Sequence, residues 1–362
     1  MAWVGSLLYV SPPVLKTVDT LTTVISGYMV VLVAPRGRLC VLVTLTLLSS
    51  YGGAIECIAL YAVTRYFRSH CTGTEIATAS TSSNFRRALR LATLGFTAVC
   101  IHEIDTGILP AKHRKSTWEA GQLSLMDTGL GYFIISDSLS SINRSCPYWK
   151  GQLYLLVAGI VRVCIGFYLP GADKEEYGPY WNSFLTMLLV RVLGFLAKRL
   201  KRTQSLLCIG TLMGLNQVIL SFYPQNPVLR FAGPWAALLG YFPLHVLTQL
   251  IFTIAQDHSN KNLKHLMILV LLCLFYFPSQ AGVNAHFMSP AVVFLLLATT
   301  YCCWILTVHC PRDSVPPVRG QWAFLSANIL TGAYKILRPR GIYFTLFEIL
   351  YIEVFVLCLG QV

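Results

Sequence analysis

Long apolar stretches, separated by short polar segments, run almost from one end of the chain to the other. About a dozen such stretches contain roughly 16 to 28 residues each, and a helix needs about 20 residues to cross the ~30 Å hydrocarbon layer of a bilayer. They lack the alternation of polar and apolar residues that barrel strands require. We therefore expect membrane helices at residues 18–34, 39–66, 89–104, 123–142, 151–169, 181–197, 205–222, 231–255, 265–283, 287–309, 321–337 and 342–360.

This pattern predicts an all-α polytopic membrane protein, a bundle of about 11 to 13 transmembrane helices. The count is a range because Gly52 and Gly53 fall inside the 39–66 stretch, which is one long tilted helix or two short ones. The Ser/Thr-rich segment 67–86 is interpreted as an exposed loop. No internal repeat or low-complexity tract divides the chain, so we expect one membrane domain over residues 1–362.

Composition agrees with this fold class, because 55% of the residues are hydrophobic and only 12% are charged. The net charge of +13 would suggest nucleic acid in a soluble protein, but here the basic residues stand in short loops between apolar stretches. We expect the lipid bilayer as a partner and no nucleic acid. The 12 cysteines show no paired CxxC spacing and the histidines no HExxH spacing, so no metal site is predicted.

The basic run at residues 198–202 sets the predicted orientation, because cytosolic loops carry an excess of Lys and Arg. Counting back from it places the loop 143–150 in the cytosol and the loops 105–122 and 170–180 together on the opposite, lumenal or external, side. The sequon at Asn143 would then remain unglycosylated.

The loop 105–122 carries Lys112, Arg114 and Lys115 on the side where the charge bias disfavours them. These cations suit a bound anion such as a phosphodiester or the phosphates of coenzyme A, or simply contact lipid headgroups. Asp105 ends an apolar stretch just before them. An acid at a membrane edge is a candidate catalyst, although solvated structural acids are more common there.

Polar residues also fall inside the apolar stretches. Asp127 begins one of them, where capping is the plainest interpretation. Asp137 lies deeper in the same stretch, and Arg162 and Arg191 lie in the middle of two others. Because an Arg at the helix centre costs ~3 kcal/mol or more when unpaired, we expect Arg162 in particular to meet an acidic partner or a phosphate. Asn328 is interpreted as a partner for a neighbouring helix or as a site residue.

Four stretches, kept in order and spacing, are similar to the inositol acyltransferases of glycosylphosphatidylinositol (GPI) anchor synthesis, the phosphatidylinositol-glycan class W family. Residues 125–137, LMDTGLGYFIISD, resemble that family's LMDLGVGSFVFSN. Residues 105–115 resemble its DFPIFPRRFAK, with Asp105 and Lys115 at the two ends. Residues 159–162 followed by 176–184 resemble GLLR and EYGVHWNFF, and residues 324–332 resemble FLLANVSTG. Together with Arg90, which matches an Arg of the family, these motifs mark a region of about residues 86–337.

Three departures from the family pattern stand out: Asp137 replaces an Asn, Tyr180 a His, and Lys335 an Asn. They bear on substrate recognition more than on the reaction.

The resemblance implies transfer of a fatty acyl group, usually palmitoyl, from acyl-CoA to the inositol of glucosaminyl-phosphatidylinositol in the endoplasmic reticulum membrane. Acyl-CoA is a co-substrate, and no cofactor is implied. Asp105 would act as the general base, and Lys115 would orient it or stabilise the thioester oxyanion and a nearby phosphate, with both catalytic loops on the lumenal side. The implied substrate-binding residues are Arg90, Asp127, Gly129, Gly131, Ser136, Arg162, Glu176, Tyr177, Gly178, Trp181, Asn182, Asn328 and Thr331.

Two other classes of function compete with this one. In a multi-pass lipid or solute transporter, Arg162, Arg191 and Glu348 would define a permeation path. In a receptor or a structural subunit of a membrane complex, the same residues would carry no chemistry with acyl-CoA.

Overall fold

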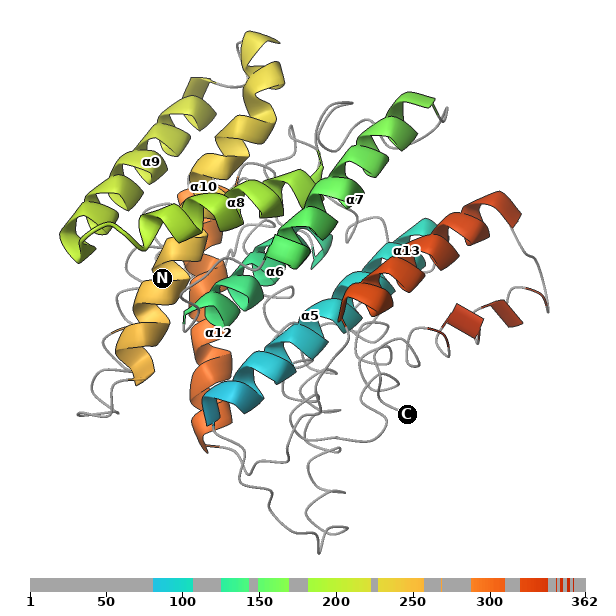
Figure 1. Ribbon diagram of the computed structural model, residues 1–362, viewed down its shortest axis with the longest axis horizontal. Helices are drawn as coiled ribbons and strands as arrows, with labels where there is room; N and C mark the ends of the chain where they lie inside the picture. Colours follow the sequence, from blue (N-terminus) through green and yellow to red (C-terminus); the bar gives the residue numbers. More distant parts are fainter. Residues whose placement is uncertain are drawn as a thin grey trace, which may run out of the picture. The chain divides into compact units, whose positions relative to one another are not determined.

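The computed structural model describes residues 81–106, 125–142, 149–168, 182–222, 227–256, 288–309 and 320–337, with isolated positions at 268 and between 343 and 354. Within these ranges every regular element is an α-helix (Figure 1). The helices are α5 (Thr81–Thr106), α6 (Leu125–Ser141), α7 (Trp149–Tyr168), α8 (Ser183–Ala197), α9 (Arg202–Phe222), α10 (Pro227–Gln256), α12 (Pro290–His309) and α13 (Gly320–Leu337).

These eight helices correspond one for one to eight of the apolar stretches. The all-α fold class is therefore confirmed for the described part of the chain. Two segments, Arg202–Phe222 and Trp235–Ala255, are long and apolar enough to cross a bilayer, which is consistent with a membrane protein. The stretches 18–34, 39–66 and 265–283, and most of 342–360, lie outside the described residues, so the number of spans stays a prediction.

One boundary was wrong. The loop interpreted at residues 67–86 ends earlier than expected, because α5 already begins at Thr81. The reason is the buried Phe85, whose ring meets that of Trp304 edge to face at a centroid distance of 5.1 Å. Phe85 starts an apolar stripe that continues through Ala88, Leu89 and Ala92 on the same helix, and this burial extends the helix into a polar sequence.

The chain divides into two compact units. Unit 1 comprises Met1–Arg114, Ser124–Gly129 and Tyr301–Val362, and unit 2 comprises Lys115–Leu123 and Leu130–Thr300. Whether they form the single domain expected from the sequence is not tested by this division.

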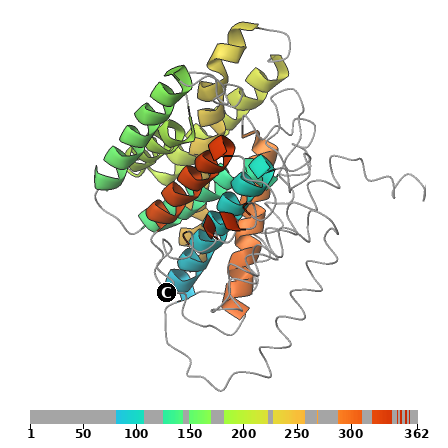
Figure 2. The same ribbon diagram turned by 90° about the vertical axis from the view of Figure 1, so that its right-hand side faces the viewer.

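In unit 1, α13 packs against α5, and the two helices lie side by side in both views (Figures 1 and 2). Farther along the chain, Tyr351 donates a hydrogen bond to the backbone carbonyl of Ala98 on α5 over 2.9 Å. Helix α5, whose last turn contains the predicted catalytic Asp105, is thus hydrogen-bonded to the C-terminal part of the chain.

In unit 2, α8 packs against both α7 and α10, and α9 packs against α10. The side of α8 that is buried is a stripe of small and branched residues, Thr186, Val190, Gly194 and Ala197, at helical spacing. Small residues permit close helix approach, which is how membrane helices associate when water provides no driving force between them.

Candidate functional site

The structure places the predicted site residues in three groups. Some lie outside the described residues: Lys115, Glu176, Tyr177, Gly178 and Trp181. For others only the backbone position is described: Asp105 in the last turn of α5, Asp127 in the first turn of α6, and Asn328 on α13. The remaining residues are described in full: Arg90, Gly129, Gly131, Ser136, Arg162, Asn182 and Thr331. The expected convergence of Asp105 and Lys115 therefore stays a prediction.

Helix α5 fixes the backbone position of Asp105. Leu91, Leu94 and Ala98 are all buried and lie along one side of this helix. Asp105 comes seven positions after Ala98, or about two turns, so its Cα returns to nearly the same side of the helix axis. Arg90, the predicted substrate-binding residue earlier on α5, is exposed.

Asn182 is the N-cap of α8. Its side-chain oxygen accepts hydrogen bonds from the backbone N–H groups of Phe184 and Leu185 at 3.0 and 3.2 Å, while its amide nitrogen donates to the carbonyl of Gly159 on α7 at 2.9 Å. This buried amide therefore caps the start of α8 and also connects α8 to the preceding helix, α7. The structure thus gives this predicted substrate-binding residue a structural role.

Gly159 belongs to the same joint. A Cβ atom added there would stand 2.7 Å from a methyl group of Leu185, closer than real Cβ atoms approach. Gly129 and Gly131 of the 125–137 motif have similarly close neighbours: a Cβ atom added at Gly129 would stand 3.1 Å from the hydroxyl of Thr97, and one added at Gly131 would collide with the side chain of Leu296. Helix packing therefore accounts for these glycines in the described part of the chain.

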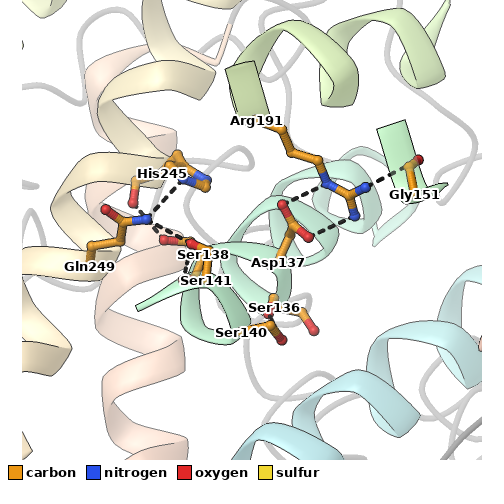
Figure 3. A network of polar contacts seen from close by, with 9 residues as sticks. All are labelled: Ser136, Asp137, Ser138, Ser140, Ser141, Gly151, Arg191, His245 and Gln249. Carbon is orange, nitrogen blue, oxygen red and sulfur yellow. Dashed lines mark hydrogen bonds and ion pairs between the residues drawn. The ribbon is translucent and has the colours of Figure 1, made fainter. Parts of the chain in front are cut away.

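Asp137 and Arg191 form an ion pair between α6 and α8 (Figure 3). The guanidinium is bidentate: Nε donates to one carboxylate oxygen at 2.8 Å, and Nη2 lies 2.6 Å from the other. Its Nη1 also reaches the carbonyl of Gly151 at 3.5 Å. The two side chains are only 24% and 19% exposed, so each charge depends on the other for compensation.

The turn after Asp137 continues this polar seam toward α10. Ser138 donates to the backbone carbonyl of His245 at 2.7 Å, and the Gln249 amide nitrogen donates to the Ser141 hydroxyl at 2.8 Å (Figure 3). Lys198 donates to the carbonyl of Ser141 at the end of α6, a favourable place for a cation. We call this set of α6, α8 and α10 residues the polar seam: Asp137, Ser138, Ser141, Arg191, Lys198, His245 and Gln249.

His245 belongs to the same hydrogen-bonded group. The Ser141 hydroxyl donates to the carbonyl of Ser138, and its oxygen accepts from the Gln249 amide nitrogen. The same nitrogen lies 3.1 Å from His245 Nε2, within hydrogen-bond distance. The ring fits because α8 has Gly194 there, against which the imidazole packs.

The sequence predicts Arg162 as the buried cation that needs a partner, but the structure shows Arg162 exposed on α7 and Arg191 in the ion pair.

Two further predicted site residues are buried. The backbone carbonyl of Ser136 accepts a hydrogen bond from the hydroxyl of Ser140. Thr331 is buried on α13. Gln249 was missed. The signal that points to the ion pair is the presence of charges of opposite sign, Asp137 and Arg191, inside two apolar stretches.

No group of three or more His, Cys, Asp or Glu side chains that could hold a metal ion occurs among the described residues. The seam is a set of helix-to-helix bonds, with Arg191 and Asp137 compensating each other.

Comparison with known proteins identifies the family. The GWT1 family model matches residues 6–312. The chain belongs to the GWT1 family. The resemblance inferred from the four motifs is therefore confirmed, and the matched region includes α5 to α10 and α12.

Three curated relatives show how far this similarity reaches. GPI-anchored wall transfer protein 1 of Kluyveromyces lactis is 25% identical over 292 residues, which cover 67% of this chain and 64% of the relative. The protein of the same name from Cryptococcus neoformans var. grubii is 23% identical over 331 residues, covering 66% and 54%. Glucosaminyl-phosphatidylinositol-acyltransferase PIGW of Bos taurus is 23% identical over 254 residues, covering 60% and 49%. The chain thus spans between about half and two thirds of these GWT1-family relatives.

Proposed function

We propose that the protein is a membrane O-acyltransferase of GPI-anchor biosynthesis, which moves a fatty acyl group from acyl-CoA to the inositol of glucosaminyl-phosphatidylinositol. Membership of the GWT1 family supports this proposal, together with the Bos taurus relative, which is named a glucosaminyl-phosphatidylinositol acyltransferase. The motifs at 105–115 and 125–137 lie inside the matched region. Palmitoyl-CoA is the donor that the resemblance favours.

The chemistry requires a base, because an inositol hydroxyl has a pKa far above 7 and attacks a thioester poorly until its proton is removed. In the proposed mechanism, the Asp105 carboxylate takes this proton as the oxygen attacks the thioester carbon. Lys115 orients the carboxylate or stabilises the oxyanion of the tetrahedral intermediate. The C–O bond forms, the C–S bond breaks, and coenzyme A leaves as a thiolate that takes up a proton.

The membrane is part of the proposal, because the glycolipid acceptor and the acyl tail both partition into lipid. We propose a multi-pass protein of 11 to 13 helices in the endoplasmic reticulum, with the Asp105 and Lys115 loop on the lumenal side. The apolar helices α9 and α10 support the membrane placement, and the basic run at 198–202 supports the orientation.

The proposal is tested in membranes that lack the native enzyme, supplied with labelled acyl-CoA and glucosaminyl-phosphatidylinositol. Wild-type protein should form an alkali-labile acylated inositol lipid. Asp105→Asn and Lys115→Ala should each reduce the rate by about 100-fold or more, the range typical of a lost acid–base group. Lys150→Ala removes an exposed lysine at the start of α7 and serves as the matched control.

Wild-type rates in Asp105→Asn or Lys115→Ala would reject the catalytic assignment. Movement of a lipid or solute across the bilayer, without any acylated product, would instead favour the transporter.

A further inference from the structure

Among the described residues of unit 1, a hydrogen bond between positions far apart in the sequence joins Tyr351 to α5. The Tyr351 side chain is 3% exposed, and its hydroxyl donates to the backbone carbonyl of Ala98 at 2.9 Å, across 253 positions of sequence. We infer that Tyr351 is a positioning residue, whose hydroxyl fixes the part of α5 that leads to Asp105. This inference rests on the proposed function, in which Asp105 is the base.

The hydrogen bond is not needed to complete the helix. A carbonyl in the interior of an α-helix already accepts the N–H four residues later, so the phenol uses the second lone pair of the Ala98 oxygen. The bond therefore adds a fixed point between α5 and the C-terminal segment. It restrains both rotation of α5 about its axis and sliding along it.

Ala98, where Tyr351 is hydrogen-bonded, lies on nearly the same side of α5 as Asp105. Leu91, Leu94 and Ala98 form the buried side of α5, and Asp105 follows Ala98 by seven positions, about 10 Å along the axis, on nearly the same side. A rotation of α5 at Ala98 would thus be carried directly to Asp105, because the helix continues unbroken to Thr106.

The segment that carries Tyr351 is itself held in place. The ring of Phe347, one turn earlier, meets that of Tyr334 on α13 edge to face at a centroid distance of 5.5 Å, and α13 packs along α5 (Figure 2). The family match ends at residue 312, so this support for α5 comes from a part of the chain beyond the matched region. The motif around Asp105 therefore gives no indication that the C-terminal segment supports α5.

The test is Tyr351→Phe, which removes one oxygen atom and keeps the ring. Tyr343→Phe is the matched control, since Tyr343 lies on the same segment but is 71% exposed. In the acyl-transfer assay, Tyr351→Phe should lower kcat by about 5- to 20-fold, because small misplacements of a catalytic group have effects of this order or larger. KM for acyl-CoA and for the glycolipid should change less than about twofold. Tyr343→Phe should match wild type in both parameters.

A second measurement separates positioning from folding. The melting temperature of Tyr351→Phe in detergent should stay within about 4 °C of wild type, since one hydrogen bond contributes only modestly to net stability. An unchanged kcat, a rise in KM alone, or a melting temperature lowered well beyond that range would each overturn the positioning role while wild type still forms product. If wild type forms no acylated lipid, the proposed function fails, and the inference fails with it.

Discussion

Helices α6 and α9 both form from apolar stretches of the sequence, yet their surfaces are buried to very different extents. Most described residues of α6 are buried, among them Tyr132, Ile134, Ile135, Ser136, Ser138 and Leu139, and only one side of the helix, with Phe133, Asp137 and Ser140, is half-buried. On α9 only Ile209, Met213 and Asn216 are buried, and they form one stripe along the side that packs on α10. Much of the remaining surface of α9 is exposed, and it includes large apolar side chains such as Leu207, which is 73% exposed.

The difference shows what polar residues in an apolar helix indicate. Helix α9 qualifies as a membrane span by length and composition, while the 17-residue α6, with its serines and Asp137, does not. Each polar group of α6 that belongs to the seam meets a partner on α8 or α10. Because lipid offers no hydrogen bonds, polar residues have to face protein, and their density is a measure of how deeply a helix lies in the bundle.

The largest loss of stability is expected when the ion pair between Asp137 and Arg191 is broken. Arg191→Leu would leave Asp137 mostly buried without its counter-ion, and the free energy of unfolding should fall by about 2 to 4 kcal/mol. Replacing both residues by Leu should restore most of that loss, because no uncompensated charge remains. Stability is measured by denaturant titration in detergent micelles. A single variant as stable as the double variant would show that the ion pair does not hold α6.

A smaller change in stability is expected when one methyl group is added to a glycine, and its sign should differ between α8 and α9. A Cβ atom at Gly194 would collide with the His245 ring, whose orientation is held by Gln249, so Gly194→Ala should cost about 1 to 3 kcal/mol. A Cβ atom at Gly210 on α9 meets nothing within 4 Å, and Gly210→Ala should stabilise the helix by up to about 1 kcal/mol. Thermal melts of the two variants in the same detergent compare the sites directly. Equal losses would contradict the difference in packing.

The fold was largely predictable because membrane helices leave a strong signal in the sequence. Eight predicted segments became α5 to α10, α12 and α13, with most ends displaced by only a few residues. The stretch predicted at 205–222, for example, is α9 at Arg202–Phe222. The largest displacement, at the start of α5, arises from the contact of Phe85 with Trp304, two residues far apart in the sequence. Periodicity within a segment cannot reveal such a tertiary contact.

The candidate site was predictable in its residue types more than in its pairings. Asp137 was recognised as a departure from the family's Asn, and Arg191 as a charge inside an apolar stretch, but nothing in the sequence joins the two. The structure explains the departure, because a carboxylate at 137 compensates the guanidinium on α8. Asn182 likewise proved to be a helix cap. The roles of Asp105 and Lys115 stay predictions.

The smallest loss of stability is expected at the polar contact between α9 and α10. The Asn216 amide donates to the carbonyl of Ala236 on α10 at 2.9 Å, from a position that is otherwise within an apolar stripe. Asn216→Leu should weaken this helix pair by only about 0.5 to 1.5 kcal/mol, the range measured for hydrogen bonds between membrane helices. Leu207→Ala, on the exposed side, is the control and should change stability by less than about 0.5 kcal/mol. A loss for Asn216→Leu as large as that for Arg191→Leu would mean that a single amide holds α9 as firmly as the ion pair holds α6, and that polar density is a poor guide to depth in this bundle.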